Sequence, residues 1–100
     1  MLYVGILSVE LILPHARGLK DRRRVVLSLK ERARSRYHVG AAEVGDANIL
    51  RRAELAFTTV AGSHSVVERT LDALERLVFS AEAEIGLLRR AVRSAGDLWG

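Results

Sequence analysis

The chain has 100 residues, of which 49% are hydrophobic and 28% are charged, and its formal net charge is +4. This composition is typical of a soluble globular protein rather than a disordered one, and the length predicts a single domain over residues 1–100. The absence of cysteine excludes disulfides, thiolate metal sites and thiol nucleophiles. No apolar run approaches the roughly 20 residues of a membrane span, so we expect a cytoplasmic protein without a membrane segment.

The first apolar segment, residues 2–13, alternates as a strand does. Leu7, Val9 and Leu11 have the same parity, and the polar residues between them have the other. The segment lacks the basic start and the small-residue cleavage site of a signal peptide. We therefore predict a first strand with one buried face, ended by Pro14, the only proline of the chain.

The next segment combines a helical pattern with a high positive charge. A helix with one buried stripe is predicted, because apolar residues recur at spacings of three and four: Val25, Val26, Leu29 and Ala33. Between Arg17 and Arg36 the chain has nine lysines and arginines but only two carboxylates, a local balance of +7 that leaves −3 for the remaining residues. Such an uneven distribution is typical of a surface that meets a polyanion.

Five cations of this helix form the candidate phosphate-contacting site. At about 100° per residue they project away from the buried stripe. The five are Lys20, Arg23, Arg24, Lys30 and Arg34. Arg22 and Arg36 point toward the buried side near the two ends, and we expect their guanidinium groups to reach solvent. Two interpretations remain open, a phosphate-binding surface or the solvated face of a helix, and the scarcity of neighbouring carboxylates supports considering the first.

Two further strands are predicted, at residues 37–44 and 50–61. They are joined by a loop of turn-forming residues, Gly45–Asn48, which is short enough for an antiparallel hairpin. The alternation in the second of these strands places three side chains in the core: Ala53, Leu55 and Phe57.

A second helix is expected after the turn at residues 62–65. Ser65 and Glu68 have the spacing of a capping box, in which each side chain bonds the backbone N–H of the other residue. A helical stripe of four apolar residues then continues along the segment: Val67, Leu71, Leu74 and Val78.

The segment at residues 81–96 has conflicting signals. Ala, Glu, Leu and Arg dominate it, and their propensities favour a helix. A fourth strand at Ile85–Ser94 would instead complete a β-α-β-β-α-β order. We predict the strand, and with it an α+β, ferredoxin-like sandwich: a four-stranded antiparallel sheet with two helices on one face.

Three stretches of the chain together resemble the YlxP-like proteins, small bacterial proteins that form a domain family of unknown function. The stretches are VELILP, LKDRRRVVLSLKERARSRYHVGAAEV and RRAELAFTTVAGSHSVVERTLDALERLV. The most specific residues are Leu19, Lys20, Arg23 and Arg24, followed by Ala42, Glu43 and Val44. The resemblance covers the chain to about Val78 and implies a ferredoxin-like fold that includes the last strand. Family members usually have a serine at the position of Gly18, where it would cap the helix.

The resemblance implies no established activity. The genes of the family often lie among those for translation initiation and ribosome maturation, which suggests ribosome-associated factors as partners. The expected function is therefore a non-enzymatic binding module that contacts structured RNA or a ribonucleoprotein through the basic first helix. The alternative is an oligomerising structural or ligand-sensing domain with no nucleic-acid role, although the sequence shows no polar cluster that would line a ligand pocket.

Catalytic and metal chemistry have little support in the residues. Among the three histidines only His64 has a carboxylate at a metal-ligand spacing. Ser63, His64 and Asp72 are the residue types of a catalytic triad, but they lie close together on one helix. Arg17 and Asn48 lie in separate loops and do not form the phosphate-binding loop of an acylphosphatase, an activity that occurs on this fold. We expect no enzyme, no cofactor and no metal.

The strand face that no helix covers has an apolar character. Val4 and Ile6 fall on this face, whereas Tyr3 and Phe57 have the parity of the core, which argues against base stacking on sheet aromatics. Either another chain or the two apolar residues near the carboxy terminus, Leu98 and Trp99, would cover Val4 and Ile6. We expect a homo-oligomer that forms through the open sheet face.

Overall fold

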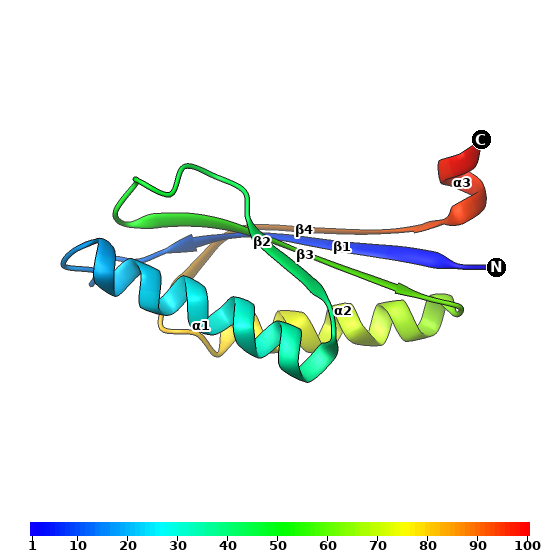
Figure 1. Ribbon diagram of the computed structural model, residues 1–100, viewed down its shortest axis with the longest axis horizontal. Helices are drawn as coiled ribbons and strands as arrows, with labels where there is room; N and C mark the ends of the chain where they lie inside the picture. The colour runs from blue at the N-terminus through cyan, green and yellow to red at the C-terminus, as the bar shows by residue number, and fades with distance from the viewer.

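In the computed structural model, which describes residues 1–100, a four-stranded antiparallel sheet has two long helices packed on one face (Figure 1). The elements follow the order β1 (Tyr3–Ile12), α1 (Leu19–Tyr37), β2 (Gly40–Glu43), β3 (Arg52–Ala61), α2 (His64–Phe79), β4 (Glu84–Ser94) and α3 (Ala95–Trp99). The strand order across the sheet is β2-β3-β1-β4. The predicted ferredoxin-like fold is thereby confirmed, including the last strand. None of the helices is long and apolar enough to cross a membrane.

The register of the sheet is set by its central strand, β1. Leu7 pairs with Phe57 of β3 on one side and with Arg90 of β4 on the other. Between β1 and β4 the register shifts, so that Gly86 and Leu87 together lie opposite Glu10. Two residues against one is a β-bulge, which bends the longer strand. A Cβ on Gly86 would lie 2.3 Å from Glu10 Oε1, so any larger residue at this position requires the Glu10 side chain to shift.

The core lies between the sheet and the two long helices. The predicted inward residues of β1, β3 and α2 are all buried, which confirms the alternation in the strands and the helical stripe. The fully buried side chains include Leu7, Val9, Leu11, Leu29, Leu55, Phe57, Val67, Leu71, Leu74 and Val78. At about 1.5 to 3 kcal/mol for each large apolar side chain, this burial is the main stabilising contribution to the fold.

The element boundaries differ most from the prediction at the end of α1 and at the beginning of α2. Tyr37 is the last residue of α1, not part of a strand, and His38 ends the helix in the left-handed conformation at φ 54° and ψ 43°. β2 therefore begins only at Gly40. The predicted capping box of Ser65 and Glu68 is wrong, because α2 already begins at His64. The Glu68 carboxylate instead accepts a hydrogen bond from Arg90 of β4.

The short carboxy-terminal helix α3 was not predicted. Ser94 and Asp97 form its capping box, because the hydroxyl of Ser94 accepts from the Asp97 N–H and the Asp97 carboxylate accepts from the Ser94 N–H. α3 rises from the end of β4 on the side of the sheet opposite α1 and α2 (Figure 1). The capping box of this chain therefore belongs to α3 and not to α2, where one had been predicted.

Candidate nucleic-acid interface

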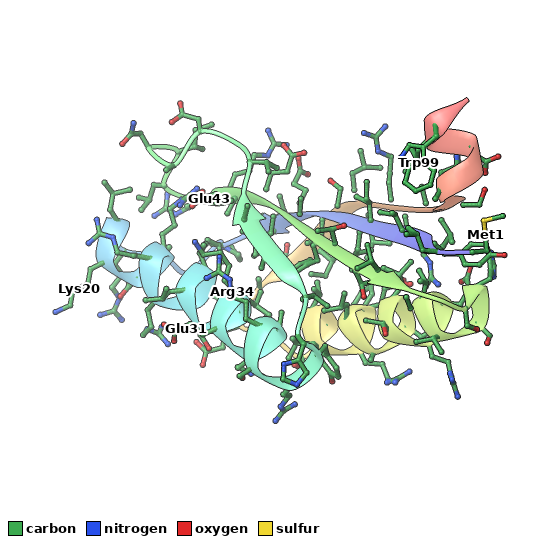
Figure 2. All side chains as sticks on the ribbon, turned by 45° about the vertical axis from the view of Figure 1, so that its right-hand side comes forward. Met1, Lys20, Glu31, Arg34, Glu43 and Trp99 are labelled. Carbon is green, nitrogen blue, oxygen red and sulfur yellow. The ribbon has the colours of Figure 1, made fainter.

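The five predicted cations lie on the solvent side of α1, but they divide between its two flanks. Figure 2 shows Lys20 and Glu31 pointing away from the sheet and Arg34 lying on the side of α1 that faces β2. Four of the five side chains are exposed, whereas Lys30 is half-buried. The structure therefore confirms that none of the five belongs to the core, and it separates them by the neighbours they contact.

Arg23, Lys30 and Arg34 share the flank of α1 that faces β2. Their spacing of seven and four residues places them in one row along the helix. Arg23 and Lys30 line a hollow of about 210 Å³ between α1 and the connection from β2 to β3, together with Leu27. At the far end of the row, Arg34 donates a hydrogen bond to the carbonyl oxygen of Ala41.

Arg24 lies on the opposite flank of α1. Its Nη1 is 3.3 Å from Glu82 Oε2, in the connection between α2 and β4, and both side chains are largely exposed. Such a solvent-exposed pair contributes between about 0 and 1 kcal/mol to stability, but it does neutralise the charge of Arg24. Arg24 therefore does not join the row that Arg23, Lys30 and Arg34 form.

The row is bordered by a buried arginine that we had expected to reach solvent. The side chain of Arg22 is only 4% exposed, and its guanidinium forms an ion pair with Glu43 of β2. It also donates to the carbonyl oxygens of Ile49, at 2.7 Å, and Arg52, at 3.0 Å. These acceptors belong to β2, to β3 and to the connection between them, so Arg22 fixes this connection against α1 and forms one wall of the hollow.

Most of the positive charge of α1 has no carboxylate partner. Within 4 Å only Arg22 and Arg24 have a carboxylate oxygen beside their guanidinium nitrogens. The remaining cations of the helix, which are Lys20, Arg23, Lys30, Arg32, Arg34 and Arg36, have none. Unlike a helix whose cations alternate with carboxylates, α1 presents a net positive field to solvent.

A second charged cluster lies on the other side of the molecule, and sequence spacing did not reveal it. Arg90 of β4 reaches α2, where it contacts Glu68, Asp72 at 2.8 Å and Glu75. Burial of the guanidinium lowers the pKa of Arg90, but the hydrogen bonds that it donates to Asp72, Glu75 and Glu68 outweigh burial and raise this pKa above its ordinary value. The three carboxylates recur on one face of α2 at spacings of four and three residues, which is the signal that could have indicated a shared partner.

Two residues that could have suggested a catalytic triad, Asp72 and His64, contact members of this charged cluster. Asp72 bonds Arg90, and His64 has its Nε2 3.8 Å from Glu68 Oε1. The His64 ring also lies edge-on against Tyr3, with the ring centroids 5.6 Å apart. Asp72 and His64 are therefore engaged with different partners.

A hollow of about 440 Å³ lies between the β1–α1 connection and the α2–β4 connection. Its polar lining consists of His15, Asp21, Arg24, Glu82 and Glu84. The sequence had shown no polar cluster that would line a pocket, because these residues come from segments about 60 positions apart in the chain.

The fold is supported by comparison with one solved structure, the first of the three that follow. The designed protein Foldit4 is similar to this chain with a TM-score of 0.55 and 12% sequence identity over 94% of this chain and 100% of that chain. The designed protein Ferredog-Diesel has a TM-score of 0.49 at 14% identity, over 88% of this chain and 83% of that chain. The regulatory subunit of aspartate kinase from Thermus thermophilus, in its ligand-free form, has a TM-score of 0.45 at 15% identity, over 92% of this chain and 57% of that chain. No curated protein matches the chain.

The family comparison covers most of the chain. Residues 4–90 match the family described as "Protein of unknown function (DUF503)". The match begins inside β1 and continues past Val78, where the resemblance seen in the sequence had become weak, into β4. The chain belongs to the DUF503 family of proteins of unknown function.

Proposed function

We propose that this chain binds structured RNA, alone or within a ribonucleoprotein, through the β2-facing flank of α1. The observation that carries the proposal is the unpaired charge on this helix: Lys20, Arg23 and Lys30 have no carboxylate within 4 Å. Cations that are free of protein partners can exchange their hydration for phosphate contacts, and the counterions released from the nucleic acid supply the driving force.

The dimensions of the cationic row fit a nucleic-acid backbone. Arg23 and Arg34 are eleven residues apart, which at a rise of 1.5 Å per residue corresponds to about 16 Å along the helix. Duplex DNA carries one phosphate per strand for every 3.4 Å or so of its axis, so a row of this length spans several phosphates of a duplex. Lys20 lies about one turn nearer the beginning of α1, where it points away from the sheet and adds positive charge beside the row (Figure 2).

The hollow beside the row gives the surface a shape as well as a charge. Leu27 is 44% exposed beside Arg23 and Lys30, and Asn48 borders the same hollow from the β2–β3 connection. An amide side chain can bond a 2′-hydroxyl or a base edge, which a phosphate contact alone cannot do. This arrangement favours recognition of RNA by shape and by its backbone.

Base stacking on the sheet is not part of the proposal. Phe57 is buried and Tyr3 is half-buried beside His64, both on the helix side of the sheet. The open face of the sheet thus presents no strand aromatic on which a base could stack. In many RNA-binding proteins of similar shape, such aromatic residues on the sheet do stack with bases. The ribosome-associated partners that the YlxP-like resemblance implies stay a prediction.

The test measures how binding of a hairpin RNA of about 16 base pairs depends on salt. We expect steep weakening, with a log-log slope of about −0.7 to −0.9 for each phosphate contact. Substitution of Lys20, Arg23 and Lys30 together by Gln should flatten the slope by roughly two to three units. The matched control substitutes three exposed arginines outside α1 by Gln, Arg51, Arg69 and Arg76, and should leave the slope unchanged.

Two outcomes contradict this proposal. One is binding whose salt slope is the same in the wild type, the α1 triple variant and the control triple variant. This result would mean that the substituted cations of α1 do not contact phosphates. The other is the absence of binding at low salt, near 50 mM, where phosphate contacts are strongest.

A second candidate function is the sensing of a small polar molecule, and one observation favours it. The hollow between the β1–α1 and α2–β4 connections has a volume of about 440 Å³, which lies within the usual range of roughly 300 to 1,000 Å³ for ligand pockets. Its charged side chains, including Arg24 and Glu82, are mostly exposed and partly neutralise one another. A rise in melting temperature with a panel of small polar metabolites, lost in Arg24→Gln, would favour this function over RNA binding.

A further inference from the structure

The open face of the sheet has an apolar centre that nothing in the chain covers. Ile6 in the central strand β1 is 49% exposed, and Val60 in β3 is 67% exposed. Trp99 of α3 lies above this face (Figure 2), yet 79% of it is exposed, and Leu98 is 60% exposed. The carboxy-terminal residues therefore do not act as an intramolecular cover for the sheet. Ile6 and Val60 are diagonal neighbours on β1 and β3, and together they give this face an exposed apolar centre that a partner can cover.

The charged residues on this face identify the kind of partner. Arg89 lies on β4 and Glu54 on β3, at positions that the register assigns to the open face on either side of β1. Neither residue has an oppositely charged group within 4 Å. One surface thus presents an unpaired cation at one edge of its apolar centre and an unpaired carboxylate at the other, and such a surface is complementary to itself.

We propose that the open sheet face binds a second copy of this chain, in a two-fold symmetric dimer with reciprocal ion pairs between Arg89 and Glu54. A two-fold axis that runs along β1 between the two sheets places β4 of each protomer over β3 of the other. Arg89 and Glu54 are then offset by two residues along the strand, or about 7 Å. This offset is within the reach of an arginine side chain across sheets that pack about 10 Å apart.

Two further charges of this face, Glu10 and Arg52, are paired with each other within the protomer, and Arg93 of β4 lies opposite Val4 toward the end of the face. Glu10 is the carboxylate that lies closest to the proposed axis and would approach its own copy. It already has a partner within the protomer, because Arg52 Nη2 lies 3.1 Å from Glu10 Oε2. Because Arg52 already balances the charge of Glu10 in each protomer, the repulsion between the two copies of Glu10 in the dimer is reduced.

The size of the face also suits a dimer. Three long strands about 4.8 Å apart, with ten residues that each rise about 3.4 Å, give a planar area of roughly 500 Å². The accessible surface of this face is larger than its planar area, because side chains and the helix α3 project from it. These contributions increase the area toward the roughly 800 Å² per partner that a specific interface buries. Beside Trp99, an apolar hollow lined by Met1 and Leu2 extends the same surface to the end of the sheet.

The dimer makes a sharp test possible, because its ion pairs are reciprocal. At tens of micromolar we expect sedimentation equilibrium to give twice the 11.0 kDa mass of one chain. Arg89→Glu and Glu54→Arg each place like charges opposite one another, so each variant alone should dissociate at least tenfold more readily. The double variant should dimerise again, and an equimolar mixture of the two single variants should form a heterodimer.

Independent measurements keep the test informative if a charge variant folds poorly. Val60→Lys should give a mass near 11.0 kDa, whereas Phe79→Lys, at an exposed apolar residue of α2, should leave the dimer intact. The single tryptophan of the chain, Trp99, should show a red shift of its emission on dilution of the wild type. A single mass of 11.0 kDa at all concentrations overturns the proposal. A dimer that is insensitive to Val60→Lys and to both charge variants overturns the assignment to this face.

Discussion

The guanidinium of Arg22 in α1 is buried against the carboxylate of Glu43 in β2. This ion pair links the first helix to the short edge strand, which has only four residues. Arg22 additionally donates to backbone carbonyl groups within the β2–β3 connection and at the first residue of β3. Its neighbour in the chain, Arg23, is exposed and has no carboxylate partner. Two adjacent arginines thus have different roles, one in holding the fold and one on the candidate RNA-binding surface.

Substitution of Arg22 by Gln should lower the free energy of unfolding by about 3 kcal/mol, because Glu43 would be left without its partner in a largely buried position. Urea denaturation followed by circular dichroism measures the change. Arg23→Gln is the control and should alter stability by less than about 0.5 kcal/mol, as exposed surface substitutions usually do. Equal effects of the two variants would contradict the structural role of Arg22.

Substitution of Gly5 by Ala should destabilise the protein by about 1 to 3 kcal/mol, the usual effect of overpacking a core. A Cβ at this position would lie 2.5 Å from Cγ1 of Val67 and 3.1 Å from Cδ1 of Leu71, and both side chains are fully buried. Gly62→Ala is the matched control, since a Cβ there has only the Met1 carbonyl oxygen within 4 Å, at 3.9 Å. A melting temperature that falls equally in both variants would show that α2 does not restrict position 5.

Substitution of Gly18 by Ser should stabilise the protein by a few tenths of a kcal/mol, because α1 begins here without a side-chain cap. The backbone at Gly18 is extended, and an added Cβ has no atom within 4 Å, so a serine hydroxyl can bond an N–H of the first turn without strain. In a domain of this size the melting temperature should rise by roughly 1 to 3 °C. Gly18→Ala lacks the hydroxyl and should lower the melting temperature, and equal effects of Ser and Ala would exclude capping.

Substitution of Arg90 by Gln should lower the free energy of unfolding by about 2 kcal/mol, since Glu68, Asp72 and Glu75 would lose their shared cation. The loss should be constant between pH 6 and pH 9 or so. The pKa of Arg90 is raised in the folded protein, so its contribution is fully present below the unfolded pKa, and both values lie above this window.

The control for this series is Arg69→Gln, at an exposed arginine of α2 with no carboxylate partner. Chemical denaturation at several pH values compares the two variants. A loss that disappears within the window from about pH 6 to pH 9 would show that Arg90 does not carry the stability of the cluster.

The sequence alone determined the elements whose residues repeat with a regular period. Leu7, Val9 and Leu11 alternate because one face of β1 is buried, and the stripe that begins at Val67 follows the helical period for the same reason. Local propensity, by contrast, would have made Ile85–Ser94 a helix. The strand there became predictable only because three preceding strands and two helices leave one edge of the sheet to fill.

The positive character of α1 was likewise determined by the sequence, but the tertiary structure decided what each cation does. Arg22, Arg23 and Arg24 are consecutive and chemically identical, yet one is buried with Glu43, one is unpaired and one meets Glu82. Along a helix, successive side chains point about 100° apart, so these neighbours contact different segments. Which carboxylate or carbonyl group lies there depends on residues 20 to 60 positions away, because packing of the sheet against the helices brings those segments together.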